Sequence, residues 1–305
     1  MSSVATGGGQ SRASRIPVPV TVRPLAPIDP EQNRAACIDM LVILYHAERA
    51  ALEAFERLGD SRVVENSEII LRARPMLMAE EEEHARDCEE MIRTLGGDSI
   101  PPAPPGFDEL WDIEQSRRKL LFPLPARVAA LFTLIAESLG YAYLYHLARA
   151  TRQANYQLSS RLDANVEAER RHIEISMDVL RSALRGTNRM ADFELALHLP
   201  AFFLLSRRAA KTMMASMAEI GFDPYVIAAS SLQFTCGLLQ SVVEETSGRG
   251  PRTRALALAA GVMASPRWMR LLATAIRMPE PPLFWTAFRA MSRIVQRMGV
   301  ERKAA

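Results

Sequence analysis

The sequence contains few of the residues that define cysteine-based and cofactor-binding proteins. Its 305 residues include 3 cysteines, Cys37, Cys88 and Cys236, which are isolated from one another and form no CxxC pair. This spacing argues against a disulfide framework and against a zinc or rubredoxin-like centre, and it favours a reducing compartment. No flavin, nicotinamide or iron–sulfur motif is present, so electrons for any redox reaction should come from a separate protein.

Lysine is also rare, and the net charge of the chain is small. Of the 37 basic residues, only Lys119, Lys211 and Lys303 are lysines, and the formal net charge is +2. The small net charge argues against nucleic-acid binding, and we attribute the arginine excess to genomic composition rather than to phosphate binding. With 49% hydrophobic and 24% charged residues, the composition is typical of a soluble globular protein.

The sequence has no long apolar run that is free of ionisable residues. The most apolar stretch, residues 128–148, is about long enough to span a bilayer, but it carries Glu137 at its middle and His146 near its end. A buried core helix explains this composition better than a membrane span. The first residues lack a continuous apolar signal core, so we expect a cytoplasmic protein.

Residues 1–28 differ from the rest of the chain in composition. They are rich in Ser, Gly, Pro and Arg, contain no acidic residue, and show no period that would bury one face. We therefore expect a disordered N-terminal tail, with a transit peptide as the less favoured interpretation.

Capping residues, glycines and prolines divide the next segment into helices. Asp29-Pro30-Glu31-Gln32 has the pattern of an N-cap followed by proline at the first helical position, and it predicts a helix that runs to Gly59. A second helix ends at Gly96-Gly97. Its start is placed between residues 62 and 75, because Pro75 should break or kink it.

Two further helices are predicted over residues 126–152 and 156–185, the second closed by Gly186. Six prolines in residues 97–125 exclude a continuous helix there and predict a long connection. Residues 187–305 contain more helices, with one boundary at Gly221-Phe222-Asp223-Pro224 and another at residues 247–251.

The main pattern is an internal repeat in which a Glu is followed three positions later by a His. Each pair also follows a lone Glu in an apolar helix, at an interval of 33 residues in the first half and 32 in the second. Residues three apart lie on one face of a helix, so each pair can direct a carboxylate oxygen and an imidazole nitrogen at one ion. The two sets are Glu48 with Glu81 and His84, and Glu137 with Glu169 and His172.

Four glutamates and two histidines suit two neighbouring iron ions, or a manganese and an iron ion. In such a site Glu81 and Glu169 bridge the ions, and Glu48 and Glu137 close the two ends. Glu48 is the only charge in its apolar stripe, and it would be costly to bury unless a cation or proton neutralises it. For Glu48 alone, the alternative is a carboxylate that reaches solvent or pairs with an arginine.

The order and spacing of these six residues resembles the ferritin-like di-iron carboxylate superfamily, over about residues 30–186. The resemblance implies an all-α fold, namely a ferritin-like four-helix bundle with a long crossover between helices 2 and 3 and additional C-terminal helices. The implied domains are a disordered tail (1–28), the dimetal bundle (29–186) and C-terminal helices packed on it (187–305). His84 and His172 would each supply one nitrogen ligand to one ion.

The same resemblance implies a non-haem di-iron oxygenase or oxidase. Such an enzyme would activate O2 to oxidise, and most simply to hydroxylate, a small organic substrate, with electrons from an external reductase or ferredoxin. The additional C-terminal helices favour this function over the alternative, a ferroxidase or peroxide-scavenging protein similar to ferritins and rubrerythrins. Hydroxylation of a modified tRNA base is less favoured because the chain is nearly neutral.

A metal-free helical binding protein ranks last, because it would leave six buried polar side chains without an evident partner. The apolar side chains of the C-terminal region would pack on the bundle or on a second copy of the chain, so a homodimer is one arrangement considered.

Several residues near the six candidate ligands are expected to have lesser roles. Tyr141, one turn after Glu137, is a candidate to hydrogen-bond a ligand or transfer an electron, although packing explains it more simply. Tyr143 is predicted to be peripheral. Asn165 stands where related aryl-amine N-oxygenases carry an additional His ligand, which argues against that subgroup.

The other glutamates of the first motif, Glu80, Glu82 and Glu83, point away from the predicted ligand row on a helical wheel. They are most simply a solvated face, although one of them could orient a ligand. His46 lies two residues from Glu48 and off its face, so it is interpreted as a surface or supporting group rather than a ligand.

Overall fold

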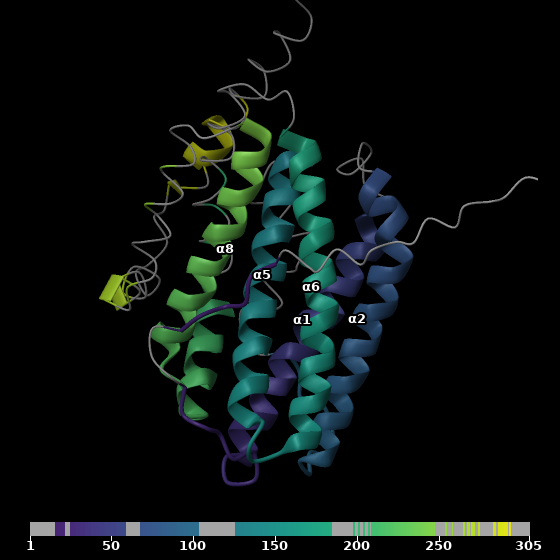
Figure 1. Ribbon diagram of the computed structural model, residues 1–305, viewed down its shortest axis with the longest axis vertical. Helices are drawn as coiled ribbons and strands as arrows, with labels where there is room; N and C mark the ends of the chain where they lie inside the picture. Colours follow the sequence, from purple (N-terminus) through teal and green to yellow (C-terminus); the bar gives the residue numbers. More distant parts are fainter. Residues whose placement is uncertain are drawn as a thin grey trace, which may run out of the picture.

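The computed structural model describes residues 16–21, 25–58, 68–103, 126–184 and 209–247, and separate positions at 198–207 and 254–293. Five long helices are defined, and the described residues form no strand, which confirms the expected all-α class. Figure 1 shows these helices side by side along the long axis of the molecule. They are α1 (Arg34–Leu58), α2 (Glu68–Thr94), α5 (Ala126–Thr151), α6 (Tyr156–Leu184) and α8 (Pro224–Ser247).

The helix ends follow the capping residues in the sequence. The Asp29 carboxylate accepts hydrogen bonds from the backbone N–H groups of Glu31 (2.9 Å) and Gln32 (3.4 Å), as expected of an N-cap. Gly96 has a φ of 85°, a conformation that glycine adopts at little cost and that commonly ends a helix, directly after α2. Asp223 caps the start of α8 by accepting from the N–H of Tyr225 at 3.0 Å.

Pro75 does not break α2, and the helix start lies within the predicted range of residues 62 to 75. The described helix begins at Glu68 and continues through Pro75 to Thr94. Pro75 is exposed, so water can bond the carbonyl group that lacks its usual N–H partner. The complete first motif therefore lies well inside one helix.

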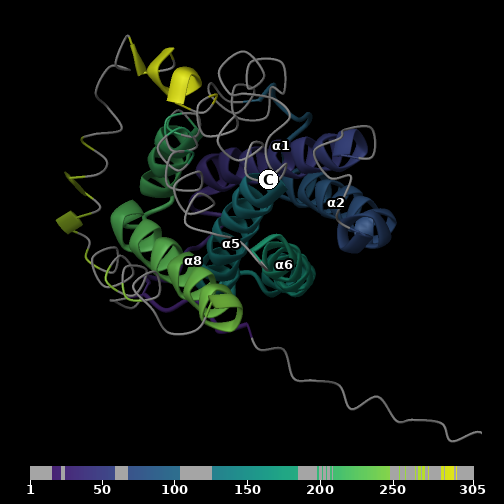
Figure 2. The same ribbon diagram turned by 90° about the horizontal axis from the view of Figure 1, so that it is seen from above.

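Ion pairs and loop contacts establish that neighbouring helices run antiparallel. Arg34 at the start of α1 lies beside Gly96 at the end of α2, and a four-residue turn joins α5 to α6. Between α2 and α6, Arg161 pairs with Glu90, and Arg171, further along α6, pairs with Glu80, which comes earlier in α2. Viewed from above, α1, α2, α5 and α6 surround a common interior, with α8 outside α5 (Figure 2).

This arrangement makes α2 and α5 run in the same direction, so the segment that joins them connects opposite ends of the four helices. Its beginning is described: after Gly96 the chain returns along α1, where the His46 ring nitrogen Nε2 contacts the carbonyl oxygen of Pro101 at 2.8 Å. These contacts fit the long connection predicted from the prolines. Residues 104–125, which hold the rest of that connection, lie outside the described part.

Part of the N-terminal segment packs on the helices, which differs from the expected disordered tail. Ile16 and Ile28 are both buried, and the Ile28 N–H donates to the carbonyl oxygen of Ala150 at 2.9 Å. Prolines at positions 17, 19, 24 and 27 separate the two isoleucines and exclude a regular helix or a central strand, so the sequence pattern did not indicate which residues of this segment are buried. Residues 1–15 and 22–24 lie outside the described part of the chain.

α8 packs against α5 and α6 and extends the core beyond the four helices. Buried polar contacts fix its position: Ser138 and Thr235 hydroxyls lie 2.7 Å apart, and His146 Nε2 lies 2.9 Å from the Ser230 hydroxyl. By length and composition α8 is apolar enough to cross a membrane. Half of its most apolar stretch, however, is buried inside the protein. A core helix of a soluble protein has the same properties, so the chain is compatible with a soluble protein.

The buried His146 predicts a pH-dependent stability. Burial, with a smaller effect from the positive charge of Arg149, lowers the pKa of His146 to about 4. The unfolded chain then binds this proton more readily than the folded one, so stability present above about pH 6.5 is lost as the pH falls toward 4. At pH 5 the expected loss from this one residue is about 2 kcal/mol.

The measurement is urea unfolding of the wild type and of His146→Gln at pH 7 and pH 5. Glutamine does not titrate, so the wild type should lose about 2 kcal/mol more than the variant between these two pH values. Equal losses in the two proteins would mean that His146 titrates normally in the folded state.

Candidate metal centre

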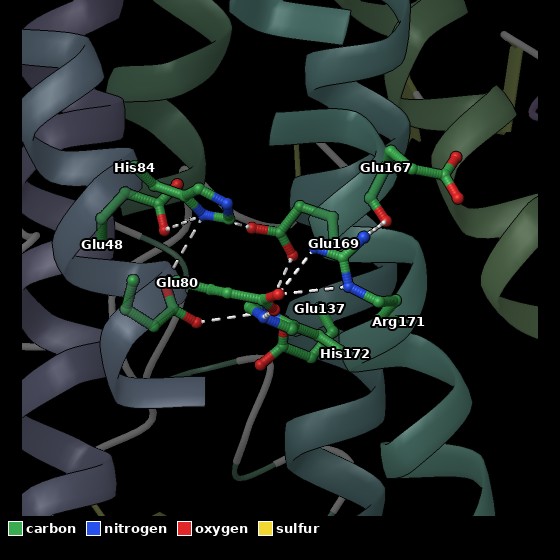
Figure 3. Close-up of polar contacts among 9 residues, drawn as sticks. Glu48, Glu80, His84, Glu137, Glu167, Glu169, Arg171 and His172 are labelled. Carbon is green, nitrogen blue, oxygen red and sulfur yellow. Dashed lines mark hydrogen bonds and ion pairs between the residues drawn. The ribbon is translucent and has the colours of Figure 1, made fainter. Parts of the chain in front are cut away.

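The structure brings the six repeated residues together from four helices. α1 contributes Glu48 and α5 contributes Glu137, while α2 and α6 each contribute one Glu-x-x-His pair. Figure 3 shows five of these side chains converging on one interior region between the helices, namely Glu48, His84, Glu137, Glu169 and His172. Five of the six residues are buried, with Glu81 and His172 each 1% exposed, and the Glu137 side chain is 11% exposed.

The two motif glutamates each span both histidines. Glu81 places Oε1 3.3 Å from Nδ1 of His172 and Oε2 4.0 Å from Nδ1 of His84. Glu169 places Oε1 3.5 Å from Nδ1 of His84 and Oε2 3.6 Å from Nδ1 of His172. Each carboxylate therefore directs one oxygen to each half of the cluster, which is the geometry of a bridging ligand.

The lone glutamates occupy the two ends of the cluster. Glu48 Oε2 lies 3.6 Å from Nδ1 of His84, and Glu137 Oε2 lies 3.6 Å from Nδ1 of His172. Helical periodicity accounts for these positions: the stripe on α1 predicted around Glu48 is buried at Leu41, Leu44 and Phe55. The internal repeat of the sequence thus becomes two similar half-sites.

Three buried polar atoms in the cluster have no hydrogen-bond partner among the described residues. They are Oε2 of Glu81 and the Nδ1 atoms of His84 and His172. Buried polar atoms nearly always have a hydrogen-bond partner. Three such atoms without one in a single cluster indicate a missing partner that can accept a lone pair from each of them. A metal ion has that property, and the donor set of carboxylates and imidazoles fits iron or manganese.

When no metal ion is bound, protons neutralise part of the negative charge of the cluster. Burial alone would lower the histidine pKa values, but the close carboxylates outweigh it. Glu169 and Glu48 raise the pKa of His84 to about 10, and Glu137 and Glu81 raise that of His172 to about 12. Both imidazoles are therefore cationic in the metal-free chain at neutral pH.

Burial and close packing also shift the pKa values of the carboxylates. Burial and the charge of Glu48 raise the pKa of Glu81 well above its ordinary value, and burial raises that of Glu169 to about 7. Burial would also raise the pKa of Glu48, but His84 and Glu81 hold it below its ordinary value. Metal ions would displace these protons, because they neutralise the same negative charge at the same atoms.

Glu80 supports the cluster from outside, which corrects its interpretation as part of a solvated face. Its Oε2 accepts a hydrogen bond from Nε2 of His172 at 2.9 Å, and its Oε1 accepts from Arg171 at 2.6 Å and 3.1 Å. Burial would raise the pKa of Glu80, but Arg171 and His172 lower it. The sequence left such a role open for one of the three flanking glutamates, but a helical wheel cannot select Glu80 because Arg171 and His172 lie on another helix.

The contact with Glu80 also determines which ring nitrogen of His172 carries a proton. With Nε2 donating its proton to Glu80, the lone pair of Nδ1 can face the cluster once the second proton has left. Figure 3 shows the chain of contacts from His172 through Glu80 to Arg171.

No protein-family model, curated protein or solved structure matches this chain. The chemistry of the site therefore rests on its own residues. Two groups among the described residues have the spacing of metal ligands: Glu48, Glu81, His84 and Glu169 form one, and Glu81, Glu137 and His172 form the other.

Tyr141 packs in the core, as its simpler interpretation expects, whereas Tyr143 lies in a place that differs from its expected one. Tyr141 is buried, but its hydroxyl bonds none of the six cluster residues, and its ring packs 5.3 Å from the ring of Phe234 on α8. Tyr143, expected to be peripheral, is 1% exposed and lies in the core with Cys37 and Cys88. α5 is covered on several sides, so a single inner face does not describe it.

Asn165 is buried on α6. His46 is half-buried and contacts the carbonyl oxygen of Pro101, away from the cluster.

A neutral substitution at Glu81 distinguishes the effect of this side chain on metal binding from its effect on the stability of the metal-free protein. Glu81→Gln replaces a buried carboxyl, whose pKa is raised, with an uncharged group of the same shape. The metal-free variant should be at least as stable as the metal-free wild type. It should gain much less from added Mn²⁺, whereas the wild type gains about 2.7 kcal/mol at a concentration of 100 times Kd.

The measurement is thermal unfolding with and without Mn²⁺, and the control is Glu82→Gln at an exposed position on the same helix. An equal metal-induced rise in Tm for Glu81→Gln and the wild type would remove Glu81 from the binding site.

Proposed function

We propose that this protein is a non-haem di-iron oxygenase or oxidase with a ferritin-like four-helix bundle formed by α1, α2, α5 and α6. The observation that carries the proposal is the bridging arrangement, in which Glu81 and Glu169 each present one oxygen to each histidine half-site. Duplicated helix pairs joined by a long connection are the architecture expected of that bundle.

In this proposal all six cluster residues are metal ligands. Glu81 and Glu169 would hold both ions, Glu48 and His84 would hold one of them, and Glu137 and His172 would hold the other. Two ferrous ions, or a manganese and an iron ion, supply the electrons that activate O2 when they are bound. The reaction is the oxidation, most simply the hydroxylation, of a small organic substrate.

The protein residues control geometry, charge and access. Leu77, Leu134 and Ile173 are buried and lie within four positions of a cluster residue in the chain, so they would help to exclude bulk water from bound ions and strengthen the attraction of those ions to the carboxylates. Glu80 holds the His172 ring in one orientation through Nε2. Glu137 is the most exposed of the six and marks the side on which the cluster is least enclosed.

An oxygenase accounts for the chain better than iron storage does. α8 adds a helix to the core outside the four helices that hold the cluster, and a site for metal alone does not require it. An external reductase or ferredoxin would supply electrons, since no motif for a second redox cofactor occurs in the sequence. On the charge and cysteine content we place this reaction in the cytoplasm.

The first test is metal content. Anaerobic loading with Fe²⁺ followed by removal of loose ions should leave about two iron ions per chain, because six protein ligands serve two positions. Glu81→Ala and His172→Ala should each retain less iron and lose O2 consumption while keeping most of their helix content by circular dichroism.

Full iron content and O2 consumption in both variants would contradict the ligand assignment. O2 consumption that follows only the amount of added Fe²⁺, with no organic compound accelerating it across a substrate panel, would favour the ferroxidase function. Acceleration by an organic compound, with transfer of an ¹⁸O atom from O2 into the product, would support the oxygenase.

A further inference from the structure

A second repeated pair of metal-binding residue types lies outside the six-residue cluster. On α1, Cys37 is followed three positions later by Met40, and on α2, Cys88 is followed three positions later by Met91. Residues three apart share one face of a helix, so each pair can direct both of its sulfur atoms at one ion. Thiolate and thioether sulfurs are soft ligands that favour Cu⁺, whereas zinc sites use Cys, His and carboxylates.

The antiparallel packing of α1 and α2 brings the two Cys-x-x-Met pairs to the same level of the bundle. Glu48 on α1 and Glu81 on α2 share one level, because both reach Nδ1 of His84. Counting 8 to 11 residues away from that level leads back from Glu48 to residues 37–40 and forward from Glu81 to residues 89–92. The range on α2 overlaps the second pair. Four sulfur atoms therefore approach one region from two neighbouring helices.

All four sulfur side chains are buried in one hydrophobic cluster of the core. Cys37 is the most exposed of them at 4%, and Met40 is fully buried. Burying a net charge in such surroundings is costly. A monovalent ion paired with a single thiolate carries no net charge, so Cu⁺ suits this place better than a divalent ion.

The thiols keep their protons until an ion displaces one of them. Burial and the charge of Asp29 raise the pKa of Cys37 to about 11, and burial raises that of Cys88 well above its ordinary value. Both cysteines are therefore neutral in the metal-free protein at neutral pH. When Cu⁺ binds, one thiol forms a copper–sulfur bond and its proton passes to water, which leaves the charge of the core unchanged.

Packing alone accounts for buried sulfur side chains, but it does not account for the hydroxyl of Tyr143. This group lies in the same part of the core, is buried, and has no hydrogen-bond partner among the described residues. Burial raises the pKa of Tyr143, and the nearby Cys37 and Cys88 raise it further. A buried hydroxyl without a partner is unfavourable, and a thiol is only a weak acceptor. A thiolate formed on metal binding would accept the hydrogen bond that this O–H group lacks.

We propose that the two Cys-x-x-Met pairs form a second metal site, which binds one Cu⁺ ion between α1 and α2. Tyr143 is a positioning residue that stabilises the bound thiolate. None of these residues belongs to the six-residue cluster, so the inference is independent of the proposed function.

The test is a competition for Cu⁺ between the metal-free full-length protein and a coloured chelator, bathocuproine disulfonate, in the absence of oxygen. The wild type should retain about one Cu⁺ ion per chain. Cys37→Ala and Cys88→Ala should each lower the affinity at least about 100-fold. Cys236→Ala is the matched control, because this third cysteine lies on α8, and it should leave the affinity unchanged.

Two conservative variants test the site without opening a large cavity. Met91→Leu keeps the size and apolar character of the side chain but removes one sulfur ligand, so it should weaken Cu⁺ binding about tenfold at unchanged helix content. Tyr143→Phe should also weaken binding about tenfold. The metal-free form of Tyr143→Phe should unfold at a urea concentration no lower than the wild type, because it lacks the unpartnered hydroxyl.

X-ray absorption at the copper edge identifies the neighbours of the bound ion. Sulfur neighbours, together with full Cu⁺ affinity in Glu81→Gln, would support the site. Neighbours that are only nitrogen and oxygen would overturn it, as would wild-type affinity in both cysteine variants or in both conservative variants. Iron loading separates this inference from the proposed function: Cys88→Ala should retain as much iron as the wild type. A wild type that binds Cu⁺ but no iron would overturn the proposed function alone.

Discussion

The confinement of four carboxylates around two imidazoles is the interaction on which the rest of this structure depends. Burying several negative charges at contact distance is unfavourable unless cations or protons neutralise them, and the raised histidine pKa values of about 10 and 12 express that requirement. The four helices must therefore hold the cluster rigidly against its own repulsion. Ion pairs outside it, such as Arg161 with Glu90 and Arg171 with Glu80, fix how α2 lies against α6.

In the proposed metal centre, the two shared carboxylates would couple the two half-sites. Because Glu81 and Glu169 each reach both histidines, a change at one position alters the charge and geometry at the other. The surroundings then distinguish positions that the ligands make similar: Glu80 holds one histidine, and Glu137 leaves that same side less enclosed. This combination of a symmetric ligand set and asymmetric support is what a centre needs if its two ions take different parts in one reaction.

Much of the site followed from periodicity. Rows such as Leu77, Glu81, His84, Cys88 and Met91 on one helix are all buried, because residues three and four apart share a face wherever one face is covered. The same reasoning failed at Tyr143, which is buried rather than peripheral because both α6 and α8 pack against α5. At Pro75 it limited the helix start correctly to residues 62 to 75, but it left open whether the helix would continue through the proline, which is exposed and is accommodated within α2.

The sequence by itself determined the all-α class and the helix ends at Asp29, Gly96 and Asp223. It also determined which six residues meet in the interior. Caps, turns and helical faces depend on residues that are close in the chain, so local patterns are sufficient to predict them. Only the tertiary structure decided which oxygen faces which histidine, that Glu80 supports His172, and that Ile16 and Ile28 pack on the helices. Those contacts join residues far apart in the chain, and their geometry depends on how whole helices lie against one another, which no local pattern encodes.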